Sequence, residues 1–564
     1  MNCRRIETLM ESPPPKDKFQ RLARSLVPAL VFVPGACLAC WSILFVEGWP
    51  QNHEFLSSFE RAEAFRQAFK EEDFFPLWSP LGFYGYGSPL PFFYHRLHST
   101  FVALLSFVTG SVYWALKLSI PILLVVGALG IERLARCLAI SSPFRLAAGV
   151  LLLFSSYTLT DWLIRGAMAE FTASMLLPWL FYYGLLVIRE SRGRTGLGIT
   201  LVLLFYSHSV IFFYSMFFLM FLAFSWALDQ RSDSKGTMVG LLRLFFVPLV
   251  IVLTLCGPYA LSVVLLAKWF NIRSLQEGYY VPTKQFRPFL RYLYDINFSW
   301  GAGWGGYSVE LGRAPLFALC ILASAGVKKR INLEIKRVLP LVFSGLFFLY
   351  LQTPISRTFY LYFPGASFIQ FPWRLLAFLT PILIILTVYI ADKCFLTSRA
   401  LVTSVISIAL IYQSVFGIRA QVIRYDRFSR TLIEERLGLV ELKFFEFLPR
   451  DFTQAITPPR RKLLQIANCE VVSQTPERDL TQTFHFRRIE LELIARDSCT
   501  VYLNQFATPF ISTEIDGGGN VERASDGTIV VRLAPGDTRR VTFRVRGLFE
   551  SLLYGLGAYT YSSS

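Results

Sequence analysis

The chain has 564 residues, of which 54% are hydrophobic and 17% are charged, and 53 of them are phenylalanines. A water-soluble core does not need so much apolar surface, so the composition excludes an ordinary soluble protein and predicts an integral membrane protein. The formal net charge of +17 comes from short clusters of lysine and arginine between apolar segments. Clusters of this kind are typical of topology signals rather than of a nucleic-acid-binding face, so we expect no nucleic-acid partner.

The N-terminal 25 residues precede an apolar run at about 26–46 and carry six basic side chains, Arg4, Arg5, Lys16, Lys18, Arg21 and Arg24. A signal peptide has a shorter apolar core and a small-residue cleavage site, whereas this run continues into Glu47-Gly-Trp-Pro. We therefore expect residues 1–25 to lie in the cytoplasm and the run to be an uncleaved anchor.

Ten apolar segments follow the anchor, at about 112–132, 146–161, 171–188, 196–207, 210–228, 240–262, 311–327, 338–351, 373–391 and 400–418. The basic linkers between them are assigned to the cytoplasm by the positive-inside rule, at 132–145, 189–195, 229–243, 328–337 and 392–399. The resulting eleven crossings predict a membrane domain over 26–418 with an outer loop at 47–111. They require that the apolar segment 92–109 stays outside as an interfacial helix. Five basic residues in the expected outer loop 264–310 oppose the rule, so either the topology differs there or the loop meets an anion.

From Arg419 onward the apolar runs stop, and five segments with a period of two residues follow, at 462–472, 483–495, 500–505, 528–533 and 539–546. Hairpin turns are expected at 516–519, 526–527 and 535–537. The pattern predicts that 419–564 is an extracytoplasmic β-sandwich domain. Its two cysteines, Cys469 and Cys499, form either a disulfide bond or two buried free thiols.

The first outer loop holds the most informative motifs. It reads Gly-Trp-Pro-Gln-Asn-His-Glu-Phe from Gly48, Phe-Pro-Leu-Trp at 75–78 and Gly-Tyr-Gly-Ser-Pro-Leu-Pro-Phe-Phe-Tyr at 85–94. An acidic residue after the first span, followed by Pro-x-Trp and Gly-Tyr-Gly-x-Pro-Leu, resembles the membrane proteins labelled 6-pyruvoyl-tetrahydropterin synthase-related. Those proteins are similar to the GT-C superfamily of polyprenyl-linked-sugar glycosyltransferases.

Three further segments extend this resemblance over nearly the whole chain: Arg165-Gly-Ala-Met-Ala-Glu170, the Ser207-His208 turn and Gln370-Phe-Pro-Trp-Arg374. The resemblance implies a GT-C-like membrane domain that ends in a sandwich. The chain departs from the pattern near the first span, where relatives have Asp and this sequence has Glu54 beside His53.

Transfer of a sugar from a lipid phosphate to a hydroxyl group needs a base for the hydroxyl and positive charge for the departing phosphate. We expect Glu54 to be the base, with Asp161 and Glu170 as further catalytic acids that orient the acceptor or hold a metal. The metal itself is unknown, and a divalent ion is one alternative. The remaining candidates are expected to bind the phosphate, the sugar or the isoprenoid chain, and they are His53, Trp78, Tyr84, Tyr86, Arg165, His208, Trp373 and Arg374.

Each candidate also has a structural alternative. Glu54 sits where a carboxylate stabilises a helix N-terminus, and Asp161 where it caps the next helix. Arg165 and Glu170 form an ion pair that fixes two helix ends, or they form a site. Arg374 anchors its helix at the interface, or it contacts the carrier phosphate, and His208 is either an interfacial histidine or a ligand.

These residues predict a glycosyltransferase of the bacterial inner membrane. It moves a sugar from a polyprenyl-phosphate carrier to an envelope glycan, lipid or protein at the outer face, among membrane lipids. Two alternatives remain open. One is a non-enzymatic scaffold that binds envelope polymer, and the other is a transporter of lipid-linked glycans, which would need ionisable residues at mid-depth in the spans.

Overall fold

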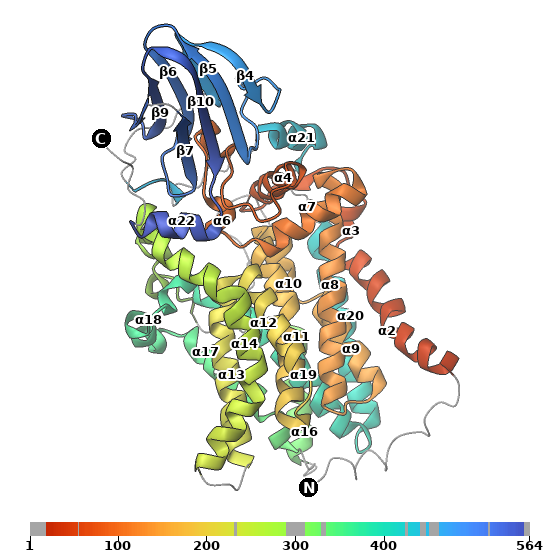
Figure 1. Cartoon of the computed structure of the whole chain (residues 1–564). Coiled ribbons are helices and arrows are strands. Elements are labelled where there is room, and N and C mark those ends of the chain that lie inside the picture. Colours follow the sequence, from red (N-terminus) through yellow and green to blue (C-terminus); the bar gives the residue numbers. More distant parts are fainter. Residues whose placement is uncertain are drawn as a thin grey trace.

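A helix bundle carries a β-sandwich at one end in the computed structural model (Figure 1). The structure describes residues 18–54, 56–229, 234–288, 311–328, 334–422, 427–439, 447–450, 462–516 and 519–557. The expected architecture, a polytopic helical membrane protein with a C-terminal β-rich part, is confirmed.

Long apolar helices form the bundle, and each of the expected spans coincides with one of them. They are α2 (Lys18–Ala39), α8 (Val112–Cys137), α9 (Ser142–Leu153), α11 (Met168–Glu190), α12 (Arg194–Ser207), α13 (Ser209–Asp229), α14 (Ser234–Leu266), α16 (Arg313–Lys328), α17 (Leu339–Leu351), α19 (Leu376–Phe395) and α20 (Arg399–Val422). Helix α9 continues through α10 (Ser156–Leu159) into the π-helix η1 (Thr160–Arg165).

Not all of these helices are long enough to cross a membrane without a bend. Among the described residues, 7 are long and apolar enough, and the count reaches 8 if α17 and the segment Pro354–Tyr362, bent by 85°, form one span. Helices α12 and α16 and the apolar part of α2, Val27–Ala39, are shorter. The count of eleven crossings therefore stays a prediction.

Shorter elements connect the helices. They are α3 (Trp41–Leu44), β1 (Trp49–Pro50), α4 (Ser57–Lys70), α5 (Gly82–Gly85), α6 (Leu90–Phe93), α7 (Leu97–Thr109), η2 (Ala267–Trp269), η3 (Ile272–Gln276), η4 (Gly278–Tyr280), η5 (Pro282–Lys284), η6 (Ile335–Arg337), η7 (Pro354–Ser356), α18 (Arg357–Tyr362), η8 (Ala366–Ile369), η9 (Pro372–Leu375), β2 (Arg427–Phe428), α21 (Arg430–Leu439) and α22 (Leu548–Gly555). Strand β1 pairs antiparallel with β2, which ties the first loop to the segment after α20.

The expected interfacial helix over 92–109 is two helices, α6 and α7, because Tyr94 is extended and breaks the run. Helix α7 ends at Gly110, whose φ of 73° is a left-handed conformation that glycine adopts without strain. Ser111 then caps α8 by accepting a hydrogen bond from the Tyr113 amide at 3.1 Å. Helices α4 and α7 lie at the sandwich end of the bundle (Figure 1).

The sandwich consists of two antiparallel four-stranded sheets in the described residues. One sheet has the order β4 (Glu470–Thr475), β5 (Arg488–Ala495), β10 (Gly536–Val545) and β7 (Ile511–Asp516), and the other has β3 (Leu464–Ala467), β6 (Cys499–Phe506), β9 (Thr528–Leu533) and β8 (Gly519–Arg523). Buried residues alternate with more exposed ones along β5, which is the signature of a strand with one face on the core.

Some details of the expected strand map are wrong. The segment 462–472 is two strands, because the chain turns at Asn468, with a φ of 60°, and passes from one sheet to the other. Strands β7 and β8 lie in segments where no strand is expected, and the connections at 516–519 and 535–537 join different sheets instead of closing hairpins. The turn at 526–527 does close a hairpin, between β8 and β9.

The first outer loop holds the sandwich on the bundle. The Trp78 indole donates to Gln505 Oε1 at 2.8 Å, and the Phe506 amide donates to the Tyr86 carbonyl at 2.8 Å. Gly87 has a φ of +90°, and a Cβ there would lie 2.3 Å from the Trp78 ring. The Gly-Tyr-Gly motif therefore provides close approach between the loop and the sandwich.

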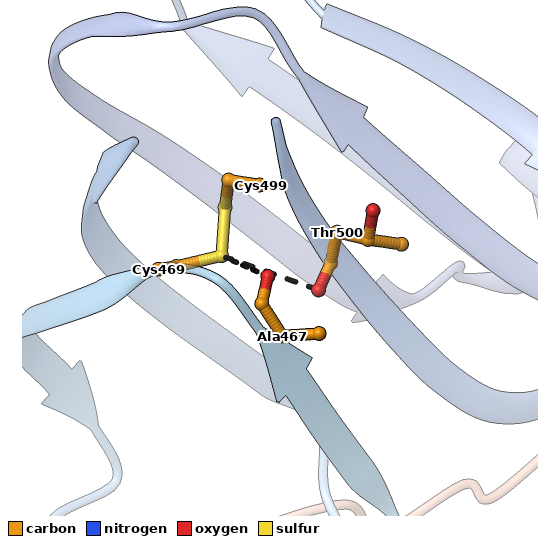
Figure 2. The surroundings of a disulfide bond; sticks show 4 residues. All are labelled: Ala467, Cys469, Cys499 and Thr500. Atoms are coloured by element: carbon orange, nitrogen blue, oxygen red, sulfur yellow. Dashed lines mark hydrogen bonds between the residues drawn. A yellow bond between two sulfur atoms is a disulfide. The ribbon is translucent and has the colours of Figure 1, made fainter. Parts of the chain in front are cut away.

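Cys469 and Cys499 form a disulfide bond with a Cα–Cα distance of 5.1 Å (Figure 2). Cys469 lies between β3 and β4, and Cys499 begins β6. The bond therefore links the crossover between the two sheets to the start of β6, an inner strand of its sheet, and the alternative of two free thiols is wrong.

The disulfide closes a loop of 30 residues in the unfolded chain, which reduces the entropy of the unfolded state. We expect the double variant Cys469→Ser/Cys499→Ser to lose roughly 3 kcal/mol of sandwich stability. Thermal unfolding of the full chain should show this loss, and dithiothreitol should have the same effect on the wild type but none on the variant. An unchanged unfolding temperature would contradict the expectation.

The topology can be checked by labelling single cysteines with a membrane-impermeant maleimide. In a background without the native reactive cysteines, positions Phe74 and Gly519 should be labelled from outside intact cells. Positions Arg192 and Val327, at the opposite helix ends, should react only after permeabilisation, since they adjoin basic linkers. Lys329, in the same expected cytoplasmic linker at 328–337, lies outside the described residues. Labelling of Gly519 from the cytoplasm would overturn the crossing count.

Candidate functional site

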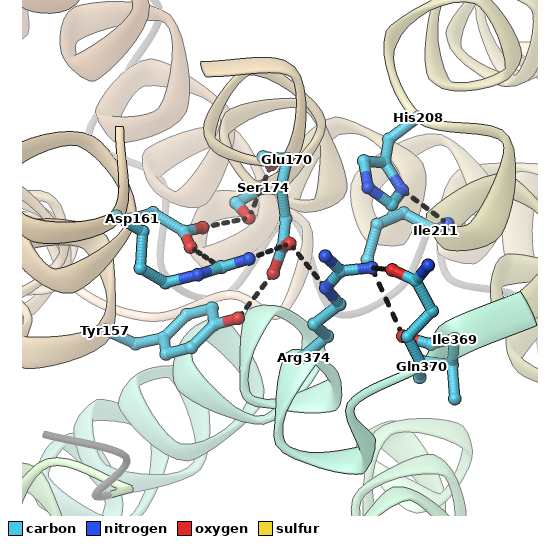
Figure 3. Close-up of polar contacts among 10 residues, drawn as sticks. Tyr157, Asp161, Glu170, Ser174, His208, Ile211, Ile369, Gln370 and Arg374 are labelled. Carbon is cyan, nitrogen blue, oxygen red and sulfur yellow. Dashed lines mark hydrogen bonds and ion pairs between the residues drawn. The ribbon is translucent and has the colours of Figure 1, made fainter. Parts of the chain in front are cut away.

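Several helix ends meet just below the sandwich. The π-helix η1 ends at Arg165, Gly166 reverses the chain with a φ of 68°, and α11 begins at Met168. The short helix η9 leads into α19 beside them and carries Trp373 and Arg374. Charged groups of η1 and α11 therefore meet Arg374, which comes from a distant part of the sequence (Figure 3).

Two carboxylates and two guanidinium groups form an ion-pair cluster, which consists of Asp161, Arg165, Glu170 and Arg374. Arg165 Nη1 contacts Asp161 Oδ1, and its Nη2 donates to Glu170 Oε2 at 2.9 Å. Arg374 Nε lies 3.1 Å from the same Glu170 oxygen. The Asp161 and Glu170 side chains are 0% and 1% exposed, so each is a charge removed from water and neutralised by a partner.

Hydroxyl groups complete the coordination of these carboxylates. Tyr157 donates to Glu170 Oε1 at 2.5 Å, and the Ser174 hydroxyl group lies 2.9 Å from the Glu170 carbonyl and 3.4 Å from Asp161 Oδ2 (Figure 3). With these bonds Asp161 and Glu170 are occupied by protein groups. The alternative of an ion pair between helix ends therefore describes Arg165 and Glu170 well. The Asp161 carboxylate pairs with Arg165 instead of capping the next helix.

The residues present do not fit a metal ion. In the ranges that the structure covers, no group of three or more His, Cys, Asp and Glu side chains is placed to hold one. Asp161 and Glu170, the expected ligands, face arginines instead. We therefore assign no metal to the cluster.

The first outer loop brings Glu54 to the edge of the cluster. The His53 amide donates to the Ile164 carbonyl at 3.0 Å, and the Glu54 amide donates to the Arg165 carbonyl at 3.1 Å. The Glu54 carboxylate accepts from Arg61 Nη2 at 2.9 Å, and its side chain is 28% exposed. Glu54 is thus the acid at this place that keeps access to solvent, and its partner is an arginine of α4.

Aromatic and histidine side chains surround Glu54. The Arg61 guanidinium lies 4.4 Å from the centre of the Tyr94 ring, and burial raises the pKa of Tyr94 to about 12. Burial lowers the pKa of His53, and the charge of Arg165 lowers it further. His53 is therefore neutral at pH 7, so its ring offers one hydrogen-bond donor and one acceptor and adds no charge.

The expected aromatic residues divide into two groups. Trp373 belongs to the cluster, because its ring centre lies 4.6 Å from the Arg165 guanidinium carbon. Trp78 and Tyr86 instead pack on the sandwich residues Phe510 and Phe506. Tyr84 lies in the tight turn of α5 with a φ of 55°.

Sequence reasoning missed several residues at the site. Arg61 and Tyr157 are two of them. The signal that could have indicated them is helical spacing, since Tyr157 precedes Asp161 by four residues and Arg61 follows Glu54 by seven. His208 lies at the turn between α12 and α13, where it stacks on His95 with ring centres 4.3 Å apart. No spacing in the sequence indicates that pair.

Comparison with known proteins gives only distant structural similarity, since no family model and no curated protein sequence matches the chain. The arabinofuranosyltransferase AftD from Mycobacteria aligns with a TM-score of 0.46 and 15% identity, over 70% of this chain and 27% of AftD. The oligosaccharyltransferase of Archaeoglobus fulgidus aligns with a TM-score of 0.46 and 12% identity, over 77% of this chain and 61% of the enzyme.

The arabinosyltransferase EmbB from Mycobacterium smegmatis aligns with a TM-score of 0.37 and 11% identity, over 97% of this chain and 67% of EmbB. The chain therefore spans about a quarter of AftD and about three fifths of the oligosaccharyltransferase. Scores and identities this low assign neither family nor activity, so the function has to be argued from the site.

Removal of the Arg165 guanidinium should destabilise the bundle, because it leaves Asp161 without its cation and Glu170 with only Arg374. We expect Arg165→Ala to cost about 3–5 kcal/mol, seen as a lower unfolding temperature in detergent. Arg192→Ala is the matched control, because its side chain is 79% exposed and its ion pair adds little. Equal unfolding temperatures for the two variants would show that the cluster does not hold the helix ends.

Proposed function

We propose that this chain is a GT-C-type glycosyltransferase that transfers a sugar from a polyprenyl-phosphate carrier to an envelope acceptor at the outer face of the membrane. The motif resemblance to the proteins labelled 6-pyruvoyl-tetrahydropterin synthase-related is part of this proposal. The observation that carries it is the position of Glu54, a partly exposed carboxylate whose amide is bonded to Arg165 beside the ion-pair cluster.

Glu54 is the proposed general base. Its carboxylate takes the proton of the acceptor hydroxyl group while the acceptor oxygen forms a bond to the anomeric carbon of the sugar. The bond between that carbon and the phosphate oxygen breaks, and the polyprenyl phosphate leaves with the electron pair. Arg61 orients the carboxylate through its 2.9 Å hydrogen bond.

The cluster supplies the electrostatic part of the proposal. Arg374 is less buried than the two acids, with a side chain 15% exposed, and it is the proposed contact for the carrier phosphate. Asp161 and Glu170 hold Arg165 and Arg374 in place, so we propose that they position these cations rather than take protons. Trp373 stacks on Arg165 and fixes its guanidinium plane.

The base can be tested with Glu54→Gln, which keeps the shape of the side chain and removes the negative charge. We expect transfer of radiolabelled sugar from synthetic polyprenyl-phosphate pentoses and hexoses, by purified protein in lipid nanodiscs, to fall by about a hundredfold or more. The unfolding temperature should stay close to that of the wild type.

Glu434→Gln is the control, because Glu434 is a half-exposed carboxylate that also pairs with an arginine, Arg430, outside the cluster. Near-normal transfer by Glu54→Gln would remove Glu54 from the mechanism. Absence of transfer by the wild type with every donor would favour the alternative of a non-enzymatic scaffold that binds envelope polymer.

A further inference from the structure

Two histidines from distant parts of the sequence stack beside the ion-pair cluster. His95 lies between α6 and α7, and His208 lies between α12 and α13. Their ring centres are 4.3 Å apart with an interplanar angle of 28°. His208 is 5% exposed and His95 is half-buried, so the two rings are largely shielded from water.

The hydrogen bonds of the two rings determine which nitrogen carries the hydrogen. The Ser209 amide donates to His95 Nδ1 at 3.3 Å. The Ile211 amide donates to His208 Nδ1 at 3.3 Å, as Figure 3 shows. These amides belong to the first turn of α13, where backbone donors lack partners within the helix. Because each Nδ1 accepts a hydrogen bond, each neutral ring carries its hydrogen on Nε2.

The pair therefore presents two N–H donors that α13 does not use. In the part of the chain that the structure describes, neither Nε2 has a hydrogen-bond partner. Burial and, to a smaller extent, the charges of Arg374 and Arg61 lower the pKa of His95 to about 3, while Glu170 acts in the opposite direction. Burial lowers the pKa of His208, and the electrostatic effects of His95, Arg374 and Arg165 act in the same direction. Both rings are thus neutral donors in a positive local potential.

The two Nε2–H groups determine which class of ligand the histidine pair can bind. A metal ion needs an unprotonated nitrogen, and the nitrogens that carry no hydrogen are already occupied by the amides of α13. A ligand of the Nε2–H groups must instead offer oxygen acceptors. The nearby guanidinium groups favour an anion over a sugar hydroxyl group.

We propose that His95 and His208 donate their Nε2–H groups to the phosphate of a lipid-borne polyprenyl phosphate, beside Arg374. The inference rests on the proposed function and adds a binding site for the leaving group. Helix α12 has 14 residues and a length of about 21 Å, which is shorter than the hydrocarbon layer of about 30 Å. On the expected topology His208 lies below the outer surface, where a phosphate carried by a lipid has access.

Two substitutions at His208 separate ligand binding from folding. In His208→Asn the amide oxygen replaces Nδ1 as the cap of α13, and asparagine is a favourable cap, so α13 is retained while the distal donor is lost. In His208→Gln the longer amide returns an N–H donor near the position of Nε2. His95→Asn removes the second donor in the same way and keeps an acceptor for Ser209.

The measurement is equilibrium binding of a fluorescent polyprenyl phosphate to the full chain in nanodiscs. We expect His208→Asn and His95→Asn each to weaken binding by about tenfold, with unchanged unfolding temperatures, and His208→Gln to recover part of the loss. The control is His98→Gln on α7, because His98 bonds to Ser119 at 3.2 Å and takes no part in the pair. That variant should bind like the wild type.

Two further probes identify the recognised group. Polyprenol has the same chain without the phosphate, and its binding should be weak and insensitive to all the histidine variants. Inorganic phosphate should compete poorly with the lipid, and strong competition would show a site for free phosphate instead of a lipid headgroup. The proposal is overturned if the Asn variants bind polyprenyl phosphate normally, or if they lose polyprenol binding to the same extent.

The outcome is independent of sugar transfer, because no donor sugar is present. Loss of binding in the histidine variants together with normal transfer by Glu54→Gln would reject the mechanism and keep the phosphate site. Normal binding by the histidine variants together with loss of transfer by Glu54→Gln would reject the phosphate site and keep the mechanism.

Discussion

Asp161 and Glu170 are fully buried carboxylates, and charges removed from water are costly unless a cation compensates for them. Arg165 lies between them and Arg374 adds a second cation on Glu170, so the arrangement of η1, α11 and η9 depends on this compensation. If one member is removed, a charge is left buried. The cluster therefore fixes the neighbouring segments η1 and α11 against η9, which comes from a distant part of the sequence.

The first outer loop takes its position from two sets of hydrogen bonds. Its early part is bonded to the backbone at Ile164 and Arg165, which places Glu54 beside the cluster. Its later part is bonded to the sandwich through Trp78 and Gln505. The sandwich thus acts on the site through the loop, because it holds the far end of the segment that carries the proposed base.

The π-helix η1 contributes a further constraint. It carries both Asp161 and Arg165, and Arg165 meets Glu170 after the chain reverses at Gly166. Glu54 pairs with the buried Arg61 and keeps a side chain that is 28% exposed, so it is the acid beside the cluster that has access to solvent. In the proposed mechanism, burial thus separates the supporting role of Asp161 and Glu170 from the proposed reactive role of Glu54.

The sequence by itself determined the membrane class, the position of each long helix and the change to strands after Arg419, because apolar length and period are local properties. It also placed Glu54, Arg165, Glu170 and Arg374 among the candidates. Only the tertiary structure decided that Cys469 bonds to Cys499 and that successive strands cross between sheets. The pairing of Arg165 with Asp161 and Glu170 is local, since the three residues lie within ten positions of one another. Only the tertiary structure joined Arg374 to Glu170 and His95 to His208, because these contacts form when distant helix ends meet, and residue spacing does not encode which ends do so.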